Sequence, residues 1–321
     1  MLFLLHLHGL LVFNYIFMAE FNINILGCGS ALPTTRHSAT SQIVDLRDKL
    51  YMIDCGEGTQ VQMRHSRVRF GRLAHIFISH LHGDHCFGLP GLISTLGMLG
   101  RTGELVIHGP KEVETFLQST IDLFCRGLEF NIRFNPIDTQ SHSLIMEDRS
   151  LSVYSIPLKH RIPTCGFLFA EKPKEAHIIR EMTDFYQVPV RWMKEIKQGK
   201  DYITPEGEII PNSRLTRPAT PAKRYAYCSD TAYNRSIIPL IEGVDLLYHE
   251  ATFMETDSAR AKETFHSTAR QAAEIARDAQ VKRLVIGHYS ARYEDLSELH
   301  KEATEVFPNT ILGNERMVIP V

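Results

Sequence analysis

The sequence predicts a layered α/β fold with a site built where its strands end. Three short apolar segments carry this prediction, because each has the pattern of a buried strand and each runs into a histidine or an acid. They are residues 76–79 before His80, residues 224–228 before Ser229 and Asp230, and residues 283–286 before Gly287 and His288. In layered α/β folds, sites form at this carboxyl edge of the strands.

The chain before the first of these segments alternates strands and glycine turns. Apolar runs predict strands at residues 23–26, 42–44 and 50–53. The first strand runs into Gly27-Cys28-Gly29-Ser30, which lacks the third glycine of a dinucleotide-binding turn and is interpreted as a tight turn beside the site. Asp54 ends the third strand, where it either orients a ligand histidine or forms an Asx turn.

The most informative stretch is His80-Leu81-His82-Gly83-Asp84-His85. Two imidazoles at i and i+2 can converge on one ion, whereas the carboxylate and the third imidazole on the next turn point toward a second ion. Imidazole nitrogen and carboxylate oxygen without a thiolate suit Zn²⁺ best, with Mn²⁺ or iron as alternatives. The simpler alternative is a capped strand end with solvated histidines.

Helices and strands continue to alternate after this motif. Helices are predicted from Gly88 and over residues 111–124, and strands at residues 105–108, 130–134 and 151–157. The last of these strands ends at Leu158-Lys159-His160, so His160 is a candidate further ligand.

The last third of the chain repeats the pattern. Residues 244–248 predict a strand that ends at His249-Glu250-Ala251-Thr252. His266-Ser267-Thr268 precedes a predicted helix over residues 269–279, in which Thr268 and Gln271 have capping-box spacing.

Charge and cysteine content limit the class of protein. The 321 residues carry a formal net charge of −2, so any polyanionic partner must be met by a local patch. The six cysteines show no C-x-x-C spacing, which indicates reduced, buried thiols and a cytoplasmic protein.

Residues 171–224 are the exception to this neutral balance. From Lys172 to Arg224 there are eleven Lys and Arg against seven acids, a net of +4. Four basic residues recur every three positions around the sole tryptophan: Arg191, Lys194, Lys197 and Lys200. On a short helix they would form a ridge suited to a phosphate backbone, and the alternative is a solvated helix face.

The first 17 residues are apolar but fit neither a signal peptide nor a membrane span. They lack a basic start and a small-residue cleavage site, and His6, His8 and Asn14 interrupt them. We expect translation to begin at Met18, which makes residues 1–17 an extension that is untranslated or disordered and residues 18–321 the folded domain. The competing interpretation is a short membrane-associating leader; no stable membrane partner is expected.

Together these motifs resemble the ribonuclease Z family of tRNA 3′-processing endonucleases. The resemblance covers residues 21–321, and its most specific parts are His249-Glu250-Ala251-Thr252 and His266-Ser267-Thr268. It implies the four-layer αβ/βα sandwich of the metallo-beta-lactamase fold, with residues 171–224 containing an inserted, protruding arm.

The resemblance also implies roles for the site residues. One zinc ion would be held by His80, His82 and His160, and a second by Asp84, His85 and His288, with Asp230 bridging the two. Asp84 would also accept a proton, and Glu250 would orient His266, which protonates the leaving oxygen. The implied reaction is hydrolysis of pre-tRNA that leaves a 3′ hydroxyl on the tRNA.

In this family the arm grips the tRNA elbow, often that of the neighbouring subunit in a homodimer. Arg191, Lys194, Lys197 and Lys200 would belong to its tip, although Arg191-Trp192 stands where the family commonly has Gly-Pro. The loop from Pro33 to His37 loosely resembles one near the RNA 3′ end.

Two other functions are compatible with parts of the pattern. A dinuclear hydrolase of the same fold that acts on small phosphodiesters or aryl sulfates would share H-x-H-x-D-H. A non-catalytic RNA-binding homologue would have lost at least one ligand, and none is lost here. A flavodiiron module resembles H-x-E-x-D instead and needs a flavin domain for which no residues remain.

Overall fold

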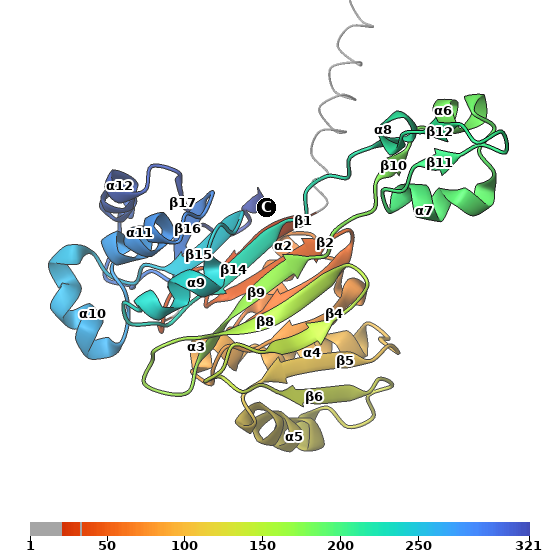
Figure 1. The fold of residues 1–321 in the computed structure, drawn as a ribbon. Helices are drawn as coiled ribbons and strands as arrows, with labels where there is room; N and C mark the ends of the chain where they lie inside the picture. Colours follow the sequence, from red (N-terminus) through yellow and green to blue (C-terminus); the bar gives the residue numbers. More distant parts are fainter. Residues whose placement is uncertain (1–20, 33) are drawn as a thin grey trace, which may run out of the picture. The chain divides into compact units, whose positions relative to one another are not determined.

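The computed structural model describes residues 21–32 and 34–321. The predictions for residues 1–17 and for Pro33 therefore lie outside the described residues. The chain divides into two compact units (Figure 1). The smaller unit comprises Asp148–Leu151 and Ala170–Lys223, and the larger unit holds the rest.

Two seven-stranded sheets form the centre of the larger unit. The first sheet has the order β18 (Val318–Pro320), β1 (Phe21–Gly27), β2 (Ser41–Leu46), β3 (Lys49–Ile53), β4 (Leu73–Phe77), β5 (Leu105–Gly109) and β6 (Ile132–Pro136). The second sheet has the order β17 (Thr310–Leu312), β16 (Leu284–Gly287), β15 (Leu246–Glu250), β14 (Arg224–Cys228), β9 (Cys165–Glu171), β8 (Leu151–Pro157) and β7 (Leu144–Glu147). Strands β3 to β6 and β14 to β17 are parallel, and the pairs β18–β1, β1–β2, β2–β3 and β7–β8 are antiparallel.

Aromatic side chains fill the space between the two sheets. The Phe77 ring of the first sheet lies 5.4 Å from Phe167 and 5.3 Å from Phe169 of the second, and Tyr51 lies 6.2 Å from Phe169. Aromatic pairs of this kind bury large apolar areas and stabilise a sandwich core. Helices pack on the outer faces, which makes four layers (Figure 1).

The helices of the larger unit connect and cover these strands. They are α2 (Thr59–His65), η1 (Phe70–Arg72), α3 (Gly83–Cys86), α4 (Leu89–Met98), α5 (Glu112–Phe124), η3 (Arg235–Ile237), α9 (Ile238–Ile241), η4 (Glu255–Asp257), α10 (Ser258–Thr264), α11 (Ala269–Asp278) and α12 (Ser297–Val306). The capping box at α11 is confirmed, because the Thr268 hydroxyl accepts from the Gln271 N–H and the Gln271 side chain accepts from the Thr268 N–H.

The smaller unit has its own short elements and a small core. Its elements are β10 (His177–Ile178), α6 (Arg180–Phe185), η2 (Val190–Trp192), α7 (Met193–Lys197), β11 (Tyr202–Ile203), β12 (Ile209–Ile210), α8 (Asn212–Leu215) and β13 (Thr216–Arg217). Val188, Ile196, Tyr202, Ile210 and Leu215 are buried together there.

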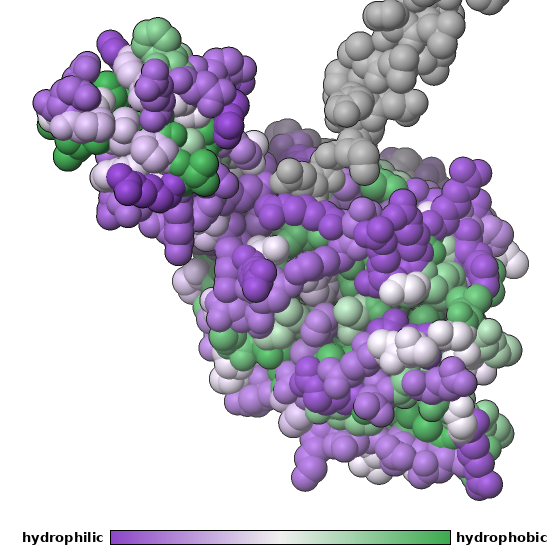
Figure 2. Space-filling view, turned by 90° about the vertical axis from the view of Figure 1, so that its right-hand side faces the viewer, coloured by the Kyte–Doolittle hydropathy of each residue, from purple (hydrophilic) through white to green (hydrophobic). Residues whose placement is uncertain are grey.

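One face of the larger unit is mainly hydrophilic, and the thiols are buried. Hydrophilic residues cover most of the face of the larger unit seen in Figure 2, with hydrophobic groups between them. The six cysteines are buried and free, as expected. Among the described residues, no helix combines the length and the apolar character needed to cross a bilayer.

Candidate metal centre

The ends of five strands meet at one edge of the sandwich and bring the sequence-predicted residues together. His80 follows β4, His160 follows β8, Asp230 follows β14, Glu250 ends β15 and His288 follows β16. The register explains this convergence, because Cys228 of β14 pairs with His249 of β15 and Glu250 pairs with Gly287 of β16.

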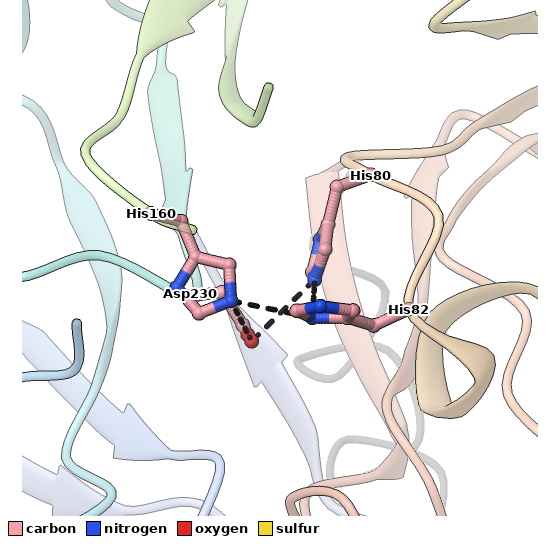
Figure 3. A group of neighbouring side chains, drawn as sticks. All are labelled: His80, His82, His160 and Asp230. Atoms are coloured by element: carbon pink, nitrogen blue, oxygen red, sulfur yellow. Dashed lines mark hydrogen bonds and ion pairs between the residues drawn. The ribbon is translucent and has the colours of Figure 1, made fainter. Parts of the chain in front are cut away.

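One cluster consists of His80, His82, His160 and Asp230, whose side chains point toward one another (Figure 3). His82 Nδ1 lies 2.9 Å from His80 Nε2 and 3.2 Å from His160 Nε2. Asp230 Oδ2 lies 3.5 Å from His80 Nε2 and 3.7 Å from His160 Nε2. Ligands about 2.0–2.1 Å from a tetrahedral Zn²⁺ would be separated by roughly 3.3 Å, so these spacings suit an ion.

A second cluster consists of Asp84, His85 and His288 and shares Asp230 with the first. Asp230 Oδ1 lies 3.1 Å from His85 Nε2 and 3.0 Å from His288 Nε2. Asp84 Oδ2 lies 3.5 Å and 3.6 Å from the same two nitrogens. Because Oδ1 and Oδ2 of Asp230 face different clusters, this carboxylate is placed to bridge two ions.

The orientation of the buried nitrogens supports metal binding rather than hydrogen bonding. His85 Nε2 and His288 Nε2 are buried and lie near the Asp230 and Asp84 carboxylates, but they form no hydrogen bond of good geometry with any described residue. An unpaired buried imidazole nitrogen is costly unless something else, such as an ion, takes its lone pair. The residues present therefore fit a pair of metal ions.

The other ring nitrogen of four ligand histidines has a fixed partner. His85 Nδ1 donates to Asp54 Oδ2 at 2.8 Å, and His160 Nδ1 donates to the Phe265 carbonyl at 3.0 Å. His80 Nδ1 is 2.9 Å from the Ser79 hydroxyl, and His288 Nδ1 is 3.0 Å from the Thr252 hydroxyl. Such partners fix the tautomer and the ring orientation, which leaves each Nε2 facing the site.

Asp54 takes the first of the two roles that its sequence position allowed. Its carboxylate also accepts from the Ser79 N–H and hydroxyl and from the buried Tyr227 hydroxyl. Ser79, Tyr227 and Thr252 were not identified as supporting residues from the sequence. Ser79 directly precedes the motif, but a serine or tyrosine in a buried strand gives no signal by itself.

Burial and charge set the ionisation of the ligands. Burial lowers the pKa of His80 well below its usual value, which keeps the imidazole neutral and able to bind a metal. Burial would raise the pKa of Asp230, but His288, His85 and His80 hold it well below its usual range. Asp230 is thus ionised at neutral pH.

A separate pair, Glu250 and His266, lies beside the second cluster. His266 Nδ1 is 2.9 Å from Glu250 Oε1, and Glu250 also accepts from the Thr231 N–H and the Thr252 hydroxyl. Burial opposes the charge on His266, yet the Glu250 carboxylate outweighs it and raises the pKa of His266 to about 9. The imidazole is therefore protonated at neutral pH and can act as a general acid.

A pocket of about 560 Å³ opens over these groups. Its lining includes site residues and flanking side chains: Ala31, Ala39, Glu57, His82, Gly83, Asp84, Phe87, His160, Arg161, Asp230, Arg260, Thr264, His266 and His288. A Cβ at Gly83 would come within 2.5 Å of the Phe87 ring, so a larger residue there would require this exposed ring to move. The backbone N–H of Ala31 donates to Asp84 Oδ2 at 2.8 Å.

The basic residues of the smaller unit form a less uniform ridge than the sequence predicts. Arg191 lies in η2 and Lys194 and Lys197 lie in α7, but Lys200 follows the helix. Lys197 is paired with Glu175 at 3.8 Å and Lys200 with Glu195 at 3.1 Å. These acids reduce the local positive charge.

Comparison with known proteins places this architecture in a family. Two family models match parts of the chain: residues 21–118 match the anti-Pycsar protein Apyc1, and residues 214–289 match a beta-lactamase superfamily domain. The crystal structure of the short form of human tRNase Z has a TM-score of 0.67 and 26% identity, covering 93% of this chain and 98% of that one. A metallo-beta-lactamase fold protein from Bacillus subtilis shares the fold, with a TM-score of 0.64 and 16% identity over 93% of this chain and 98% of that one.

Curated relatives are much closer in sequence. Ribonuclease Z of Parabacteroides distasonis is 79% identical over 304 residues, covering 95% of this chain and 100% of the relative. Ribonuclease Z of Bacteroides fragilis is 63% identical over 302 residues, covering 94% and 99%. With this identity over nearly the whole chain, the protein belongs to the ribonuclease Z family, within the metallo-beta-lactamase fold.

Proposed function

We propose that this protein is a zinc-dependent endoribonuclease that removes 3′ trailers from pre-tRNA. The observation that carries the proposal is the pair of His/Asp clusters that share Asp230, with His266 held beside them by Glu250. Membership in the ribonuclease Z family supports the RNA substrate. The proposed location is the cytoplasm.

One zinc ion would be held by His80, His82 and His160, and the other by Asp84, His85 and His288. Asp230 would contribute to both sites. When bound, two such ions acidify a shared water and neutralise charge on the phosphorus. Asp84 is proposed to accept the proton of the attacking water. His85 and His288 lower the pKa of its carboxyl group against the effect of burial, which supports an ionised Asp84.

The leaving side is served by His266. As the water oxygen bonds to phosphorus, the bond from phosphorus to O3′ of the tRNA breaks, and the His266 imidazolium gives its proton to O3′. The tRNA then carries a 3′ hydroxyl and the trailer keeps the phosphate. Glu250 stabilises the imidazolium. Its Oε1 accepts the hydrogen bond from His266 Nδ1 and thereby fixes the orientation of the ring.

The arm and the subunit arrangement are part of the proposal. Arg191, Lys194, Lys197 and Lys200 of the smaller unit are proposed to contact tRNA phosphates, and the protein is proposed to act as a homodimer. Light scattering of the purified protein tests the dimer, which requires twice the mass of one chain.

The decisive experiment offers purified protein a 3′-extended pre-tRNA and, separately, a small chromogenic phosphodiester, each with and without a chelator. We expect chelator-sensitive cleavage of the pre-tRNA that leaves a 3′ hydroxyl. Hydrolysis of the small ester without cleavage of the pre-tRNA would instead favour the small-ester hydrolase, and RNA binding without any cleavage would favour a non-catalytic homologue.

A further inference from the structure

Two arginines on one wall of the pocket have no role in the chemistry described above. We propose that Arg161 and Arg260 form a second phosphate subsite, which binds the backbone phosphate next to the scissile one on the tRNA side. This inference rests on the proposed function and deepens it, because it explains how the site selects a polynucleotide over a small ester.

The composition of the pocket lining points to these two side chains. Among the described residues that line the pocket, Arg161 and Arg260 are the only arginines or lysines. Apart from Glu57, the carboxylates and imidazoles of the same pocket belong to the two His/Asp clusters or to the pair of Glu250 and His266. Positive charge that is available to a second phosphate is therefore confined to one wall.

A hydrogen bond joins the two segments that carry these arginines, and the part of the pocket lining that these segments supply is called one wall here. Arg161 directly follows His160, whose Nδ1 donates to the Phe265 carbonyl at 3.0 Å. Arg260 lies on α10, the helix that ends immediately before Phe265 and His266. The loop after β8 and the residue that follows α10 are thus joined. Arg161 comes from that loop and Arg260 from the third position of α10, and both line the pocket.

Both guanidinium groups are available to a ligand. Arg161 is exposed and has no hydrogen bond or ion pair with a described residue. Arg260 pairs with Glu263 at 2.8 Å, but the side chains are 52% and 67% exposed, and ion pairs in water at this exposure contribute little. An RNA phosphate can displace such a partner, because a guanidinium matches two phosphate oxygens at once.

The position of His266 assigns this wall to the tRNA side of the cleaved bond. His266 must lie next to the leaving O3′, which belongs to the last nucleotide retained by the tRNA. Arg260 and Thr264 are on the helix that leads into His266, and Arg161 adjoins the loop bonded to it. The phosphate that enters this wall is therefore the one on the 5′ side of that last nucleotide.

The test compares Arg161→Met and Arg260→Met with Lys262→Met, which removes a charge from the same helix at an exposed position outside the pocket lining. Each arginine variant should raise KM for a 3′-extended pre-tRNA about ten-fold. It should also reduce the slope of log affinity against log salt concentration by about 1, the contribution of one phosphate contact. Lys262→Met should match the wild type, and all variants should share the wild-type melting temperature.

A modified substrate tests the position of the phosphate without any variant. A neutral methylphosphonate one linkage 5′ of the cleaved bond should raise the wild-type KM by a similar factor and cause little further loss in the arginine variants. An equal penalty from the methylphosphonate in wild type and variants would overturn the subsite, as would arginine variants that behave like Lys262→Met. A wild-type enzyme that leaves unmodified pre-tRNA intact would overturn the proposed function instead.

Discussion

At the scale of single residues, the proposed metal centre depends on the side chains that hold the candidate ligands in place as well as on those ligands. Asp54, Asp230 and His288 all adopt a positive φ, at 54°, 56° and 61°. Residues other than glycine adopt this conformation at an energetic cost and often at functional sites. Here the left-handed turn after each strand directs the side chain into the edge of the sandwich.

The first prediction concerns Asp54, which is not itself a candidate metal ligand but accepts a hydrogen bond from His85 Nδ1 and so orients that ring. Asp54→Asn should lower metal affinity or activity by about 10–100-fold, as found when carboxylate partners of metal-bound histidines are removed. Metal content after dialysis against a graded chelator measures the effect. Asp138→Asn, an exposed change outside the site, should bind metal like the wild type; equal metal retention in both variants would contradict the role of Asp54.

The second prediction concerns the pH dependence set by Glu250 and His266. The general acid works when protonated, and the pKa of His266 is raised to about 9, so kcat should fall as pH rises through about 9. Glu250→Gln removes the charge that raises this pKa and should move the alkaline limb to lower pH. Pre-tRNA cleavage rates from pH 6 to 10 measure this limb. The control variant Glu305→Gln should keep the wild-type pH profile. If the alkaline limb of Glu250→Gln also stays at the wild-type pH, Glu250 does not set the pKa of His266.

At the scale of elements, the parallel strands explain why distant motifs meet. β14, β15 and β16 run side by side in the same direction, so the residues that follow them reach the same edge. The sequence predicted these three strands within two residues of their observed ends. It missed β7, β9, β17 and β18 of the two sheets, and it placed the strand near residue 132 two residues too early. β9 was missed because its residues are nearly all buried and show no alternation that would mark a strand.

The third prediction concerns the start of α11, which directly follows the His266 segment. Thr268→Ala removes a hydroxyl that accepts from the Gln271 N–H and donates to Glu255 Oε2 at 2.7 Å. The free energy of unfolding should fall by about 1 kcal/mol or more, as for other lost N-caps. Urea denaturation measures it. Thr304→Ala, at a partly exposed position within α12, should cost clearly less; equal losses in the two variants would mean that the cap does not stabilise the protein more than an ordinary helical threonine.

At the scale of the whole molecule, the larger unit contains the proposed metal centre, and the smaller unit contains the basic residues proposed to contact RNA. The smaller unit buries only a few apolar side chains around Ile196 and Tyr202. Its charges are largely exposed, so its contribution to RNA binding should depend strongly on salt.

The fourth prediction follows from that separation. Reversing the charge of Lys194, Lys197 and Lys200 to Glu should weaken pre-tRNA cleavage and spare hydrolysis of a small phosphodiester, because the small ester needs only the pocket. Relative rates on the two substrates measure the effect. Reversal of Lys111, Arg126 and Lys301 in the larger unit gives a control with the same charge change. Equal loss on both substrates in the first variant would count against an RNA-binding arm.

The sequence by itself determined the α/β class, the family resemblance and the residues of the two clusters as candidates, since those depend on local patterns such as His80 to His85. The fold class and the family are confirmed. Only the tertiary structure decided which atoms face which cluster. It shows that Asp230 presents one oxygen to each cluster, that Asp54 and Thr252 contact Nδ1 of His85 and His288, and that Arg161 and Arg260 line the same pocket. The physical reason is that these contacts join residues tens to hundreds of positions apart. They are fixed by strand register, buried hydrogen bonds and backbone turns, which no local sequence pattern specifies.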